Sequence, residues 1–269
     1  MSEHGRDWEG YYHAQEGRPP RPLFLEALPL LPTLDPVGRP LLAIDLGCGD
    51  GTEAIELLKR GWNVFAIDNH PDAIARLQAQ AWPEHRARLT ADTVSFRDSV
   101  LPRADLIYAG LSLPFCEPTS FNEVWRQIQG ALRPNAWFVG HLFGARHGWA
   151  GKAGMTFVTA EQVASLLGNL RIHLLREQDE DGDSFSGPTH WQVFHVIAQS
   201  QQGAGRQHKA EDRVSAMPRT QGRTSDNADD LCWLTCGRVW TTRGCLYQGV
   251  TSYWRSEQGA NSTRSHLVT

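Results

Sequence analysis

The sequence lacks the features of a membrane-bound or secreted protein. No apolar run reaches the roughly 18 residues that a membrane-spanning helix requires. The first residues are polar, with Glu3, His4, Arg6 and Asp7 close together, and they do not form the apolar segment of a secretory signal. We therefore expect no membrane partner and a cytoplasmic location.

Cysteine is scarce and irregularly spaced. The five cysteines are Cys48, Cys116, Cys232, Cys236 and Cys245. Such scattered positions suit a reducing compartment better than a disulfide framework. The last three match no familiar zinc spacing and have no clear fourth ligand, so we expect no metal site.

A basic surface is also missing from most of the chain. Residues 1–200 carry 17 Lys and Arg against 24 Asp and Glu, whereas residues 201–269 carry 9 against 6. A protein that acts on nucleic acid needs a basic face for the phosphates, so we expect no nucleic-acid partner. Residues 200–269 are rich in Gly, Ser, Thr, Arg and Asn and have few periodic apolar positions, which predicts a mostly disordered tail.

The most informative motif is a glycine-rich turn between an apolar strand and a helix. Residues 41–51 are LLAIDLGCGDG, with Gly47, Gly49 and Gly51 at alternate positions, and residues 52–60 have helical spacing that stops at Gly61. Glycine adopts backbone conformations closed to other residues and lets a ligand approach the main chain. The turn therefore predicts a site for a nucleotide-type cofactor.

A second acid indicates which kind of cofactor binds. The strand predicted at residues 64–67 ends in Asp68, where a parallel sheet brings a carboxylate beside the ribose hydroxyls of a ligand on the first turn. A dinucleotide site would have glycine at the position of Thr52. The sequence thus disfavours a pyrophosphate-containing cofactor.

Helices alternate with strands over the first 199 residues. The spacing predicts strands at 41–46, 63–67, 87–91, 105–109 and 136–142, helices at 52–60, 71–81, 121–132 and 159–167, and a closing antiparallel pair at 172–177 and 191–198 joined by an acidic loop at 178–190. Thr159 and Gln162 form a predicted capping pair at the start of the last helix. We expect an α/β, doubly wound, mostly parallel seven-stranded sheet with an antiparallel last strand.

The string Asp45-Leu46-Gly47-Cys48-Gly49-Asp50-Gly51, followed by Asp68, resembles motif I and its partner acid in class I, Rossmann-like S-adenosylmethionine-dependent methyltransferases. The order of elements from about residue 5 to residue 199 is similar to that family. Gly61-Trp62-Asn63-Val64 and Asp68-Asn69-His70-Pro71 look like the small-molecule branch that includes the tellurite-resistance methyltransferases. The resemblance implies an N-terminal lid at residues 1–40, a core at 41–199 and the tail at 200–269.

The resemblance also implies S-adenosylmethionine as cofactor, S-adenosylhomocysteine as product and roles for individual residues. Asp45 would hold the amino group of the cofactor and Asp68 its ribose, with helix capping as the alternative for Asp68. Arg21 would face the cofactor carboxylate. The other expected cofactor contacts are Tyr11, Tyr12, Gly47, Cys48, Gly49, Asn69, Asp92, Thr93 and Ala109.

The loop at residues 109–116 and a second lid after the fifth strand are expected to hold the methyl acceptor, because methyl transfer needs mainly positioning in a dry site. The loop lacks the Asp/Asn-Pro-Pro-Tyr/Phe string of exocyclic amino-group methyltransferases. His141 is a candidate base, since a pKa near 6.5 suits proton removal, and a structural histidine is the alternative. The expected acceptor contacts are Ser112, Pro114, Phe115, Arg146, Trp149 and His190.

We therefore expect methyl transfer to a small molecule. A protein or RNA methyltransferase of the same fold, and a catalytically silent protein that binds S-adenosylmethionine, are the alternatives that the sequence leaves open.

Overall fold

The central feature of the fold is a mixed sheet within residues 6–201, which are the residues that the structure, a computed structural model, describes. Its strand order is β3-β2-β1-β4-β5-β8-β7, and a short additional strand, β6, pairs with β5. The first five strands pair in parallel, whereas β8 is antiparallel to both β5 and β7. The predicted doubly wound fold is confirmed, with β6 as an addition. The predicted tail and Cys232, Cys236 and Cys245 lie outside the described residues.

The strands are β1 (Leu42–Leu46), β2 (Asn63–Asp68), β3 (Leu89–Thr93), β4 (Ala104–Ala109), β5 (Leu132–Gly144), β6 (Phe157–Val158), β7 (Leu170–Ser184) and β8 (Gly187–Ser200). The α-helices are α1 (Trp8–Ala14), α2 (Pro22–Ala27), α3 (Thr52–Lys59), α4 (Pro71–Gln80), α5 (Pro118–Ala131) and α6 (Ala160–Leu167). Short 3₁₀ turns are η1 (Leu28–Leu30), η2 (Pro83–Arg88) and η3 (Leu113–Phe115).

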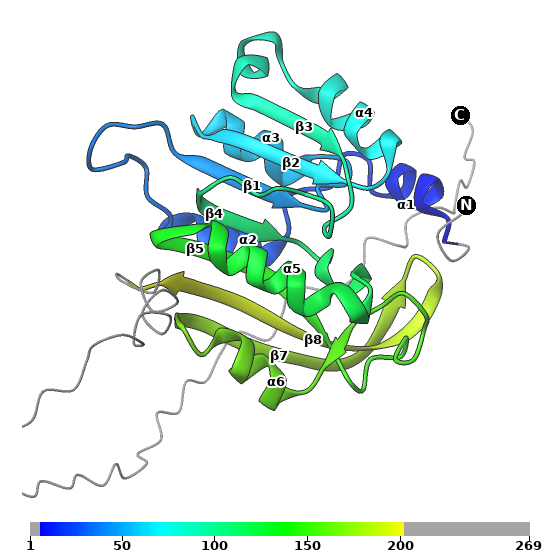
Figure 1. Cartoon of the computed structure of the whole chain (residues 1–269). Helices are drawn as coiled ribbons and strands as arrows, with labels where there is room; N and C mark the ends of the chain where they lie inside the picture. The colour runs from blue at the N-terminus through cyan, green and yellow to red at the C-terminus, as the bar shows by residue number, and fades with distance from the viewer. Residues whose placement is uncertain (1–5, 202–269) are drawn as a thin grey trace, which may run out of the picture. The chain divides into compact units, whose positions relative to one another are not determined.

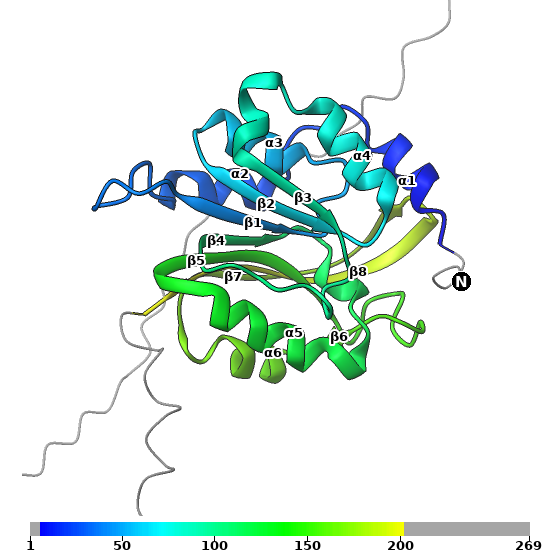
Figure 2. The same cartoon turned by 45° about the horizontal axis from the view of Figure 1, so that its top comes forward.

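Two hydrophobic cores lie on opposite faces of the sheet (Figures 1 and 2). Buried residues of α2, α3 and α4 pack on one face, and those of α5 and α6 pack on the other. Strand β4 is buried at all six positions because helices cover both of its faces. The strand order reverses where β1 and β4 lie side by side, which is the usual ligand position in such folds.

The helix boundaries follow local sequence signals. Gly51 at the start of α3 has φ of 85°, and a Cβ there would collide with the side chain of Leu77, so the predicted turn requires glycine. The capping pair is confirmed, because Thr159 Oγ1 accepts from the Gln162 amide and Gln162 Oε1 accepts from the Thr159 amide. Helix α5 begins earlier than predicted, with Pro118 in its first turn, where proline is tolerated.

The predicted acidic loop at residues 178–190 is wrong. Those residues continue β7 and β8 as one long hairpin, whose strands remain paired up to Ser184 and Gly187. The segment lacks the alternation of apolar and polar residues that usually predicts a strand. Backbone pairing with β8 and polar contacts between the two strands stabilise it instead. His190 contacts the carboxylates of Asp181 and Asp179 at 2.8 and 2.7 Å. The hairpin reaches the vicinity of α1 at its tip (Figures 1 and 2).

Candidate functional site

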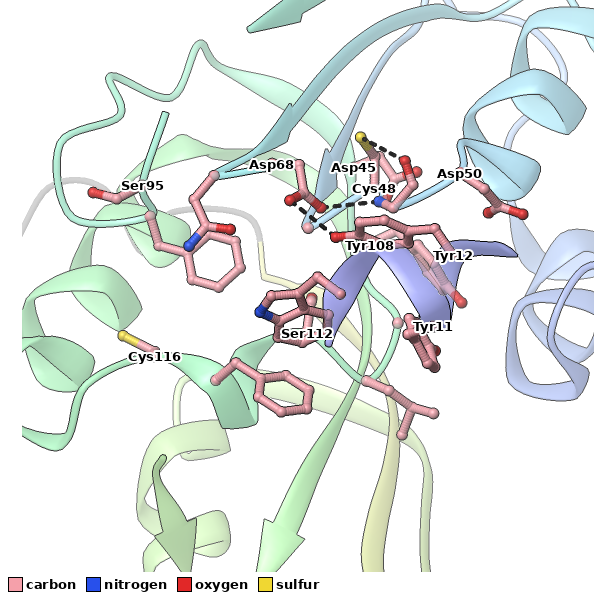
Figure 3. A pocket seen from close by; sticks show the side chains of 18 of the residues that line it. Tyr11, Tyr12, Asp45, Cys48, Asp50, Asp68, Ser95, Tyr108, Ser112 and Cys116 are labelled. Carbon is pink, nitrogen blue, oxygen red and sulfur yellow. Dashed lines mark hydrogen bonds between the residues drawn. The ribbon is translucent and has the colours of Figure 1, made fainter. Parts of the chain in front are cut away.

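A cavity of about 260 Å³ opens where the carboxyl ends of β1, β2 and β4 meet, and α1 contributes to its walls. Figure 3 shows Asp45, Cys48 and Asp68 at one end of this cavity, Cys116 toward the other end and Ser112 between them. The lining comes from segments far apart in the sequence, from Arg6 to Gly154. A concave site at this position of an α/β sheet is the expected place for a cofactor.

The glycine turn is held by hydrogen bonds to β2. The amides of Gly47 and Cys48 donate to the carbonyl of Ile67 at 2.8 and 3.0 Å. Gly47 has φ of 69°, and a Cβ there would collide with the side chain of Ser112, whose hydroxyl donates to the carbonyl of Leu46. The loop after β4 therefore packs directly against the turn, and only glycine fits between them.

Asp68 at the end of β2 is buried and accepts three hydrogen bonds from the protein. They come from the amide of Gly49 at 3.0 Å, the amide of His70 at 3.0 Å and the hydroxyl of Tyr12 at 3.3 Å. Burial raises the pKa of Asp68, and these hydrogen bonds oppose that shift. Tyr12 thereby joins helix α1 to the cavity floor.

Two polar atoms at the bottom of the cavity have no partner among the described residues. They are Oδ2 of Asp45 and the hydroxyl of Tyr108, and their side chains are 1% exposed. Asp45 and Tyr108 are register partners on β1 and β4, so they lie side by side on one face of the sheet. Burial, and then the nearby Glu53, raise the pKa of both groups. Because unpaired buried polar groups are costly, these two atoms mark a ligand position.

Two arginines line the same end of the cavity. Arg18 makes two parallel hydrogen bonds to the carboxylate of Glu53 at 2.8 and 2.7 Å. Burial opposes ionisation of Glu53, but Arg18 holds the pKa of this carboxyl below its ordinary value. Arg21 donates to the hydroxyl of Tyr11 at 3.1 Å and makes no ion pair with any described residue within 4.0 Å. The guanidinium of Arg21 therefore has N–H donors that can bind an anionic group of a ligand.

Aromatic side chains from α1 and from η3 cover the cavity. The ring of Trp8 lies 4.9 Å from Phe115 in an edge arrangement and 6.1 Å from Tyr12 in a stacked one. Tyr11 contacts Phe185 at the tip of the β7–β8 hairpin, with ring centres 5.9 Å apart. The N-terminal helix and the hairpin therefore meet beside the cavity.

His141 is buried behind the cavity and does not line it. Its Nδ1 accepts from the amide of Leu111 at 3.3 Å, and its ring lies 4.8 Å from that of His195. Burial, and then the charge of His195, lower the pKa of His141 well below its ordinary value. The structure thus gives this residue a neutral ring that supports Leu111, which lines the cavity and has φ of 60°.

The second lid lies beside the cavity rather than in its lining. Arg146 pairs with Glu177 and Asp179 on the hairpin, and Trp149 packs in a cluster with Phe143, His147 and Trp191. Hydrogen bonds to Asp181 and then Asp179 raise the pKa of His190. These contacts hold the segment at residues 143–149 against the hairpin, and its role as a lid remains a prediction.

Most of the predicted site residues line the cavity. These are Tyr11, Tyr12, Arg21, Asp45, Gly47, Cys48, Gly49, Asp68, Asn69, Ser112 and Phe115. Outside the lining are Asp92, Thr93, Ala109, Pro114, His141, Arg146, Trp149 and His190. Asp92 and Thr93 are exposed, and the lining resumes at Val94. The residues that lie outside remain predictions.

Sequence reasoning missed Trp8, Arg18, Tyr108 and the segment from Val94 to Arg97, all of which line the cavity. Tyr108 is a polar-tipped residue directly after the apolar Leu106 and Ile107 of β4, which was the available signal. Among the described residues, no cluster of His, Cys, Asp and Glu is placed to hold a metal ion. No helix in residues 6–201 has both the length and the apolar composition needed to cross a membrane.

Comparisons with known proteins agree with this geometry. A family model described as a methyltransferase domain matches residues 44–138. The structure is similar to that of TehB from Haemophilus influenzae, with a TM-score of 0.58 and 12% identity, over 72% of this chain and 67% of TehB. It is also similar to 1,6-didemethyltoxoflavin-N1-methyltransferase from Burkholderia thailandensis, with a TM-score of 0.50 and 20% identity, over 72% and 86% of the two chains.

Among curated sequences, a protein named hemagglutinin 1 from Eikenella corrodens is 30% identical over 99 residues, which are 36% of this chain and 33% of that protein. The chain thus matches about a third of the length of this relative. The chain has the Rossmann-like methyltransferase fold, and the methyltransferase-domain model matches about a third of its length. The resemblance to S-adenosylmethionine-dependent methyltransferases, including TehB, is confirmed.

Proposed function

We propose that this chain transfers the methyl group of S-adenosylmethionine to a small-molecule acceptor. The observation that carries the proposal is the buried, unpartnered Oδ2 of Asp45 in a cavity at the methyltransferase cofactor position. A positively charged amino group of the cofactor supplies the donor and the charge that this carboxylate lacks. Asp50, Glu53 and Asp68 line the same end, and they add negative potential that favours a cationic ligand.

The other polar groups at this end suit the rest of an amino-acid head group and a nucleoside. Arg21 and the hydroxyl of Tyr108 offer donors to a carboxylate, and Asp68 offers acceptor positions to ribose hydroxyls. Asn69 follows Asp68 in the lining and is proposed to border the base. The glycine turn lets the ligand lie close to the main chain. The residues present therefore fit S-adenosylmethionine.

The bound cofactor would supply an electrophilic methyl group, and the protein would position an acceptor beside it and exclude water. Transfer of this kind is an in-line displacement, in which alignment of the reacting atoms contributes most of the acceleration. Ser112 and Phe115 line the cavity from the loop after β4, and they would contact the acceptor. Tyr11 and Tyr12 from α1 would close the site.

Calorimetric titration of S-adenosylmethionine and S-adenosylhomocysteine into the full chain tests the proposal, with NADH as the control ligand. We expect saturable micromolar binding of the first two and none of NADH. Labelled methyl donor and a panel of small acceptors would then reveal turnover. Absence of binding overturns the cofactor assignment, whereas binding with no methylated acceptor supports the catalytically silent alternative.

A further inference from the structure

We propose that the methyl acceptor is a flat aromatic molecule that carries an oxygen or ring nitrogen with a free lone pair. This inference rests on the proposed function and identifies the substrate class for that site. It depends on three observations: an aromatic wall, a buried donor without a partner, and the composition of the cavity lining.

The aromatic wall consists of Trp8, Tyr11 and Phe115, with Leu111 beside them, and all four residues line the cavity. Trp8 lies edge-on to Phe115 at 4.9 Å and to Tyr11 at 5.9 Å, so the rings present both faces and edges. Phe115 also contacts Phe143 and Trp149, which fixes its ring from behind. Flat rings bind such walls by offset stacking and edge contacts, and puckered rings gain less from them.

The indole nitrogen of Trp8 is buried and has no hydrogen-bond partner among the described residues. An indole N–H only donates, so it requires a lone pair from whatever occupies the site. A buried donor left unpaired costs free energy, and a ligand oxygen or ring nitrogen removes that cost. An aromatic molecule with such an atom satisfies the stacking surface and the donor together.

The charge beside the aromatic wall favours an electron-rich ligand. The guanidinium carbon of Arg6 lies 5.1 Å from the centre of the Phe115 ring, and Arg6 donates to the carbonyl of Ala153 at 3.2 Å. Arg97 lines the cavity as well, and the acid at this end is the exposed Glu117. A nearby cation stabilises an anionic oxygen such as a phenolate.

The described lining contains no histidine and no lysine, and its carboxylates are Asp45, Asp50, Glu53 and Asp68 at the cofactor end and Glu117 beside Cys116. Cys116 at this end stays protonated, because burial and then Glu117 raise the pKa of its thiol to about 11. For a phenol acceptor, the hydroxyl proton leaves to water before transfer, which gives the phenolate. The oxygen lone pair then forms the bond to the methyl carbon while the carbon–sulfur bond breaks, and its electron pair stays on sulfur.

The test uses the full chain saturated with S-adenosylhomocysteine and matched pairs of probes that differ in ring flatness. One pair is 4-hydroxybenzoate and 4-hydroxycyclohexanecarboxylate, and others are hydroxyquinolines and nitrophenols with their saturated analogues. We expect at least one aromatic member to bind at least about tenfold more tightly than its saturated partner, because only the flat ring stacks on the wall. Equal binding within every pair, or no aromatic binding, overturns the inference.

Two variants test whether the aromatic probe binds beside Trp8. Trp8→Phe keeps an aromatic ring but removes the N–H, and we expect it to weaken the aromatic probe more than it weakens S-adenosylhomocysteine. Trp82→Phe is the matched control, because Trp82 is 59% exposed and does not line the cavity. An equal effect of the two variants on the aromatic probe contradicts the role of Trp8. Failure of S-adenosylhomocysteine itself to bind would instead contradict the proposed function, so the two failures are distinguishable.

Discussion

The hydroxyl of Tyr12 donates to the carboxylate of Asp68 at 3.3 Å, and this bond joins α1 to the end of β2, 56 positions further along the chain. Asp68 also accepts from the amides of Gly49 and His70. A carboxylate has about four acceptor positions, so three donors leave too few for both hydroxyls of a ribose. One donor must yield, and Tyr12 makes the longest of the three bonds. Its release would couple cofactor entry to movement of α1.

Substitution of Tyr12 by phenylalanine tests this coupling. The ring remains, but the competing donor is gone, so we expect Tyr12→Phe to bind S-adenosylhomocysteine as tightly as the wild type or up to about tenfold more tightly. Asp68→Ala should instead weaken binding by about 1–3 kcal/mol, the cost of losing hydrogen bonds to a charged group. Calorimetry of both variants checks these expectations.

Asp72→Asn is the control for Asp68→Ala, because the side chain of Asp72 is 56% exposed and lies outside the cavity lining. If Asp68→Ala bound S-adenosylhomocysteine with unchanged affinity, the proposal that Asp68 contacts the ribose would be wrong. A loss in Tyr12→Phe as large as that in Asp68→Ala would mean that the Tyr12 hydroxyl itself contacts the cofactor.

Tyr108→Phe tests which end of the cofactor the Tyr108 hydroxyl contacts. The Tyr108 hydroxyl has no described partner, so its removal should leave the stability of the ligand-free protein unchanged or slightly higher. We expect S-adenosylhomocysteine to bind about 0.5–1.5 kcal/mol more weakly, the worth of one hydrogen bond. 5′-Methylthioadenosine, which lacks the amino-acid part, should bind the variant and the wild type equally. Equal loss for both ligands would place the hydroxyl near the nucleoside instead.

The parts of the fold and site that the sequence predicted are those fixed by local rules. Gly47, Gly49 and Gly51 after an apolar strand specify the turn, and the helical and strand spacing specifies the doubly wound order, so the cofactor end of the cavity could be predicted. The long hairpin could not, because its polar residues around Asp181 form a strand only when β8 pairs with them.

The residues missed from the site depend on tertiary contacts. Trp8 reaches the cavity because α1 packs against Phe115, more than 100 positions away in the sequence. Arg18, which lies between α1 and α2, was overlooked because its partner Glu53 is 35 positions further along the chain, in α3. For Tyr108, pattern reasoning assigns the side chain to the core, and only the register with Asp45 places it beside a second unpaired polar group.

His141 gives a prediction about pH dependence. Burial, and then the charge of His195, lower the pKa of His141 well below its ordinary value. We therefore expect the rate of methyl transfer to show no step attributable to this residue near pH 6.5. His141→Ala should lower the free energy of unfolding by about 1–3 kcal/mol, because the Leu111 amide loses its acceptor.

The controls for His141 are His13→Ala, at an exposed position of α1, and the wild-type rate profile. A step near pH 6.5 that disappears in His141→Ala would restore His141 as the base that the sequence suggested. Chemical denaturation and labelled methyl donor provide the two measurements.

Asp45→Asn should have opposite effects on the free and the ligand-bound protein. Burial raises the folded-state pKa of Asp45 above its unfolded value of about 3.9, so the folded protein holds this proton more tightly than the unfolded chain does. The contribution of Asp45 to the free energy of unfolding is therefore largest below about pH 4. It decreases as the pH rises toward the folded-state pKa. The amide that replaces the carboxyl cannot ionise, so the ligand-free variant should melt higher than the wild type at neutral pH, with a difference that shrinks toward pH 4.

With S-adenosylhomocysteine in excess, the order should reverse. The ligand amino group pairs with the ionised Asp45 of the wild type, whereas the variant should lose about 1–3 kcal/mol of binding free energy because it lacks that charge. Thermal unfolding across the acidic to neutral range, with and without ligand, measures both effects. A variant that melts lower than the wild type without ligand would show that the Asp45 carboxylate already has a stabilising partner. If the ligand raised the melting temperature of both proteins equally, the proposal that Asp45 contacts the cofactor would be wrong.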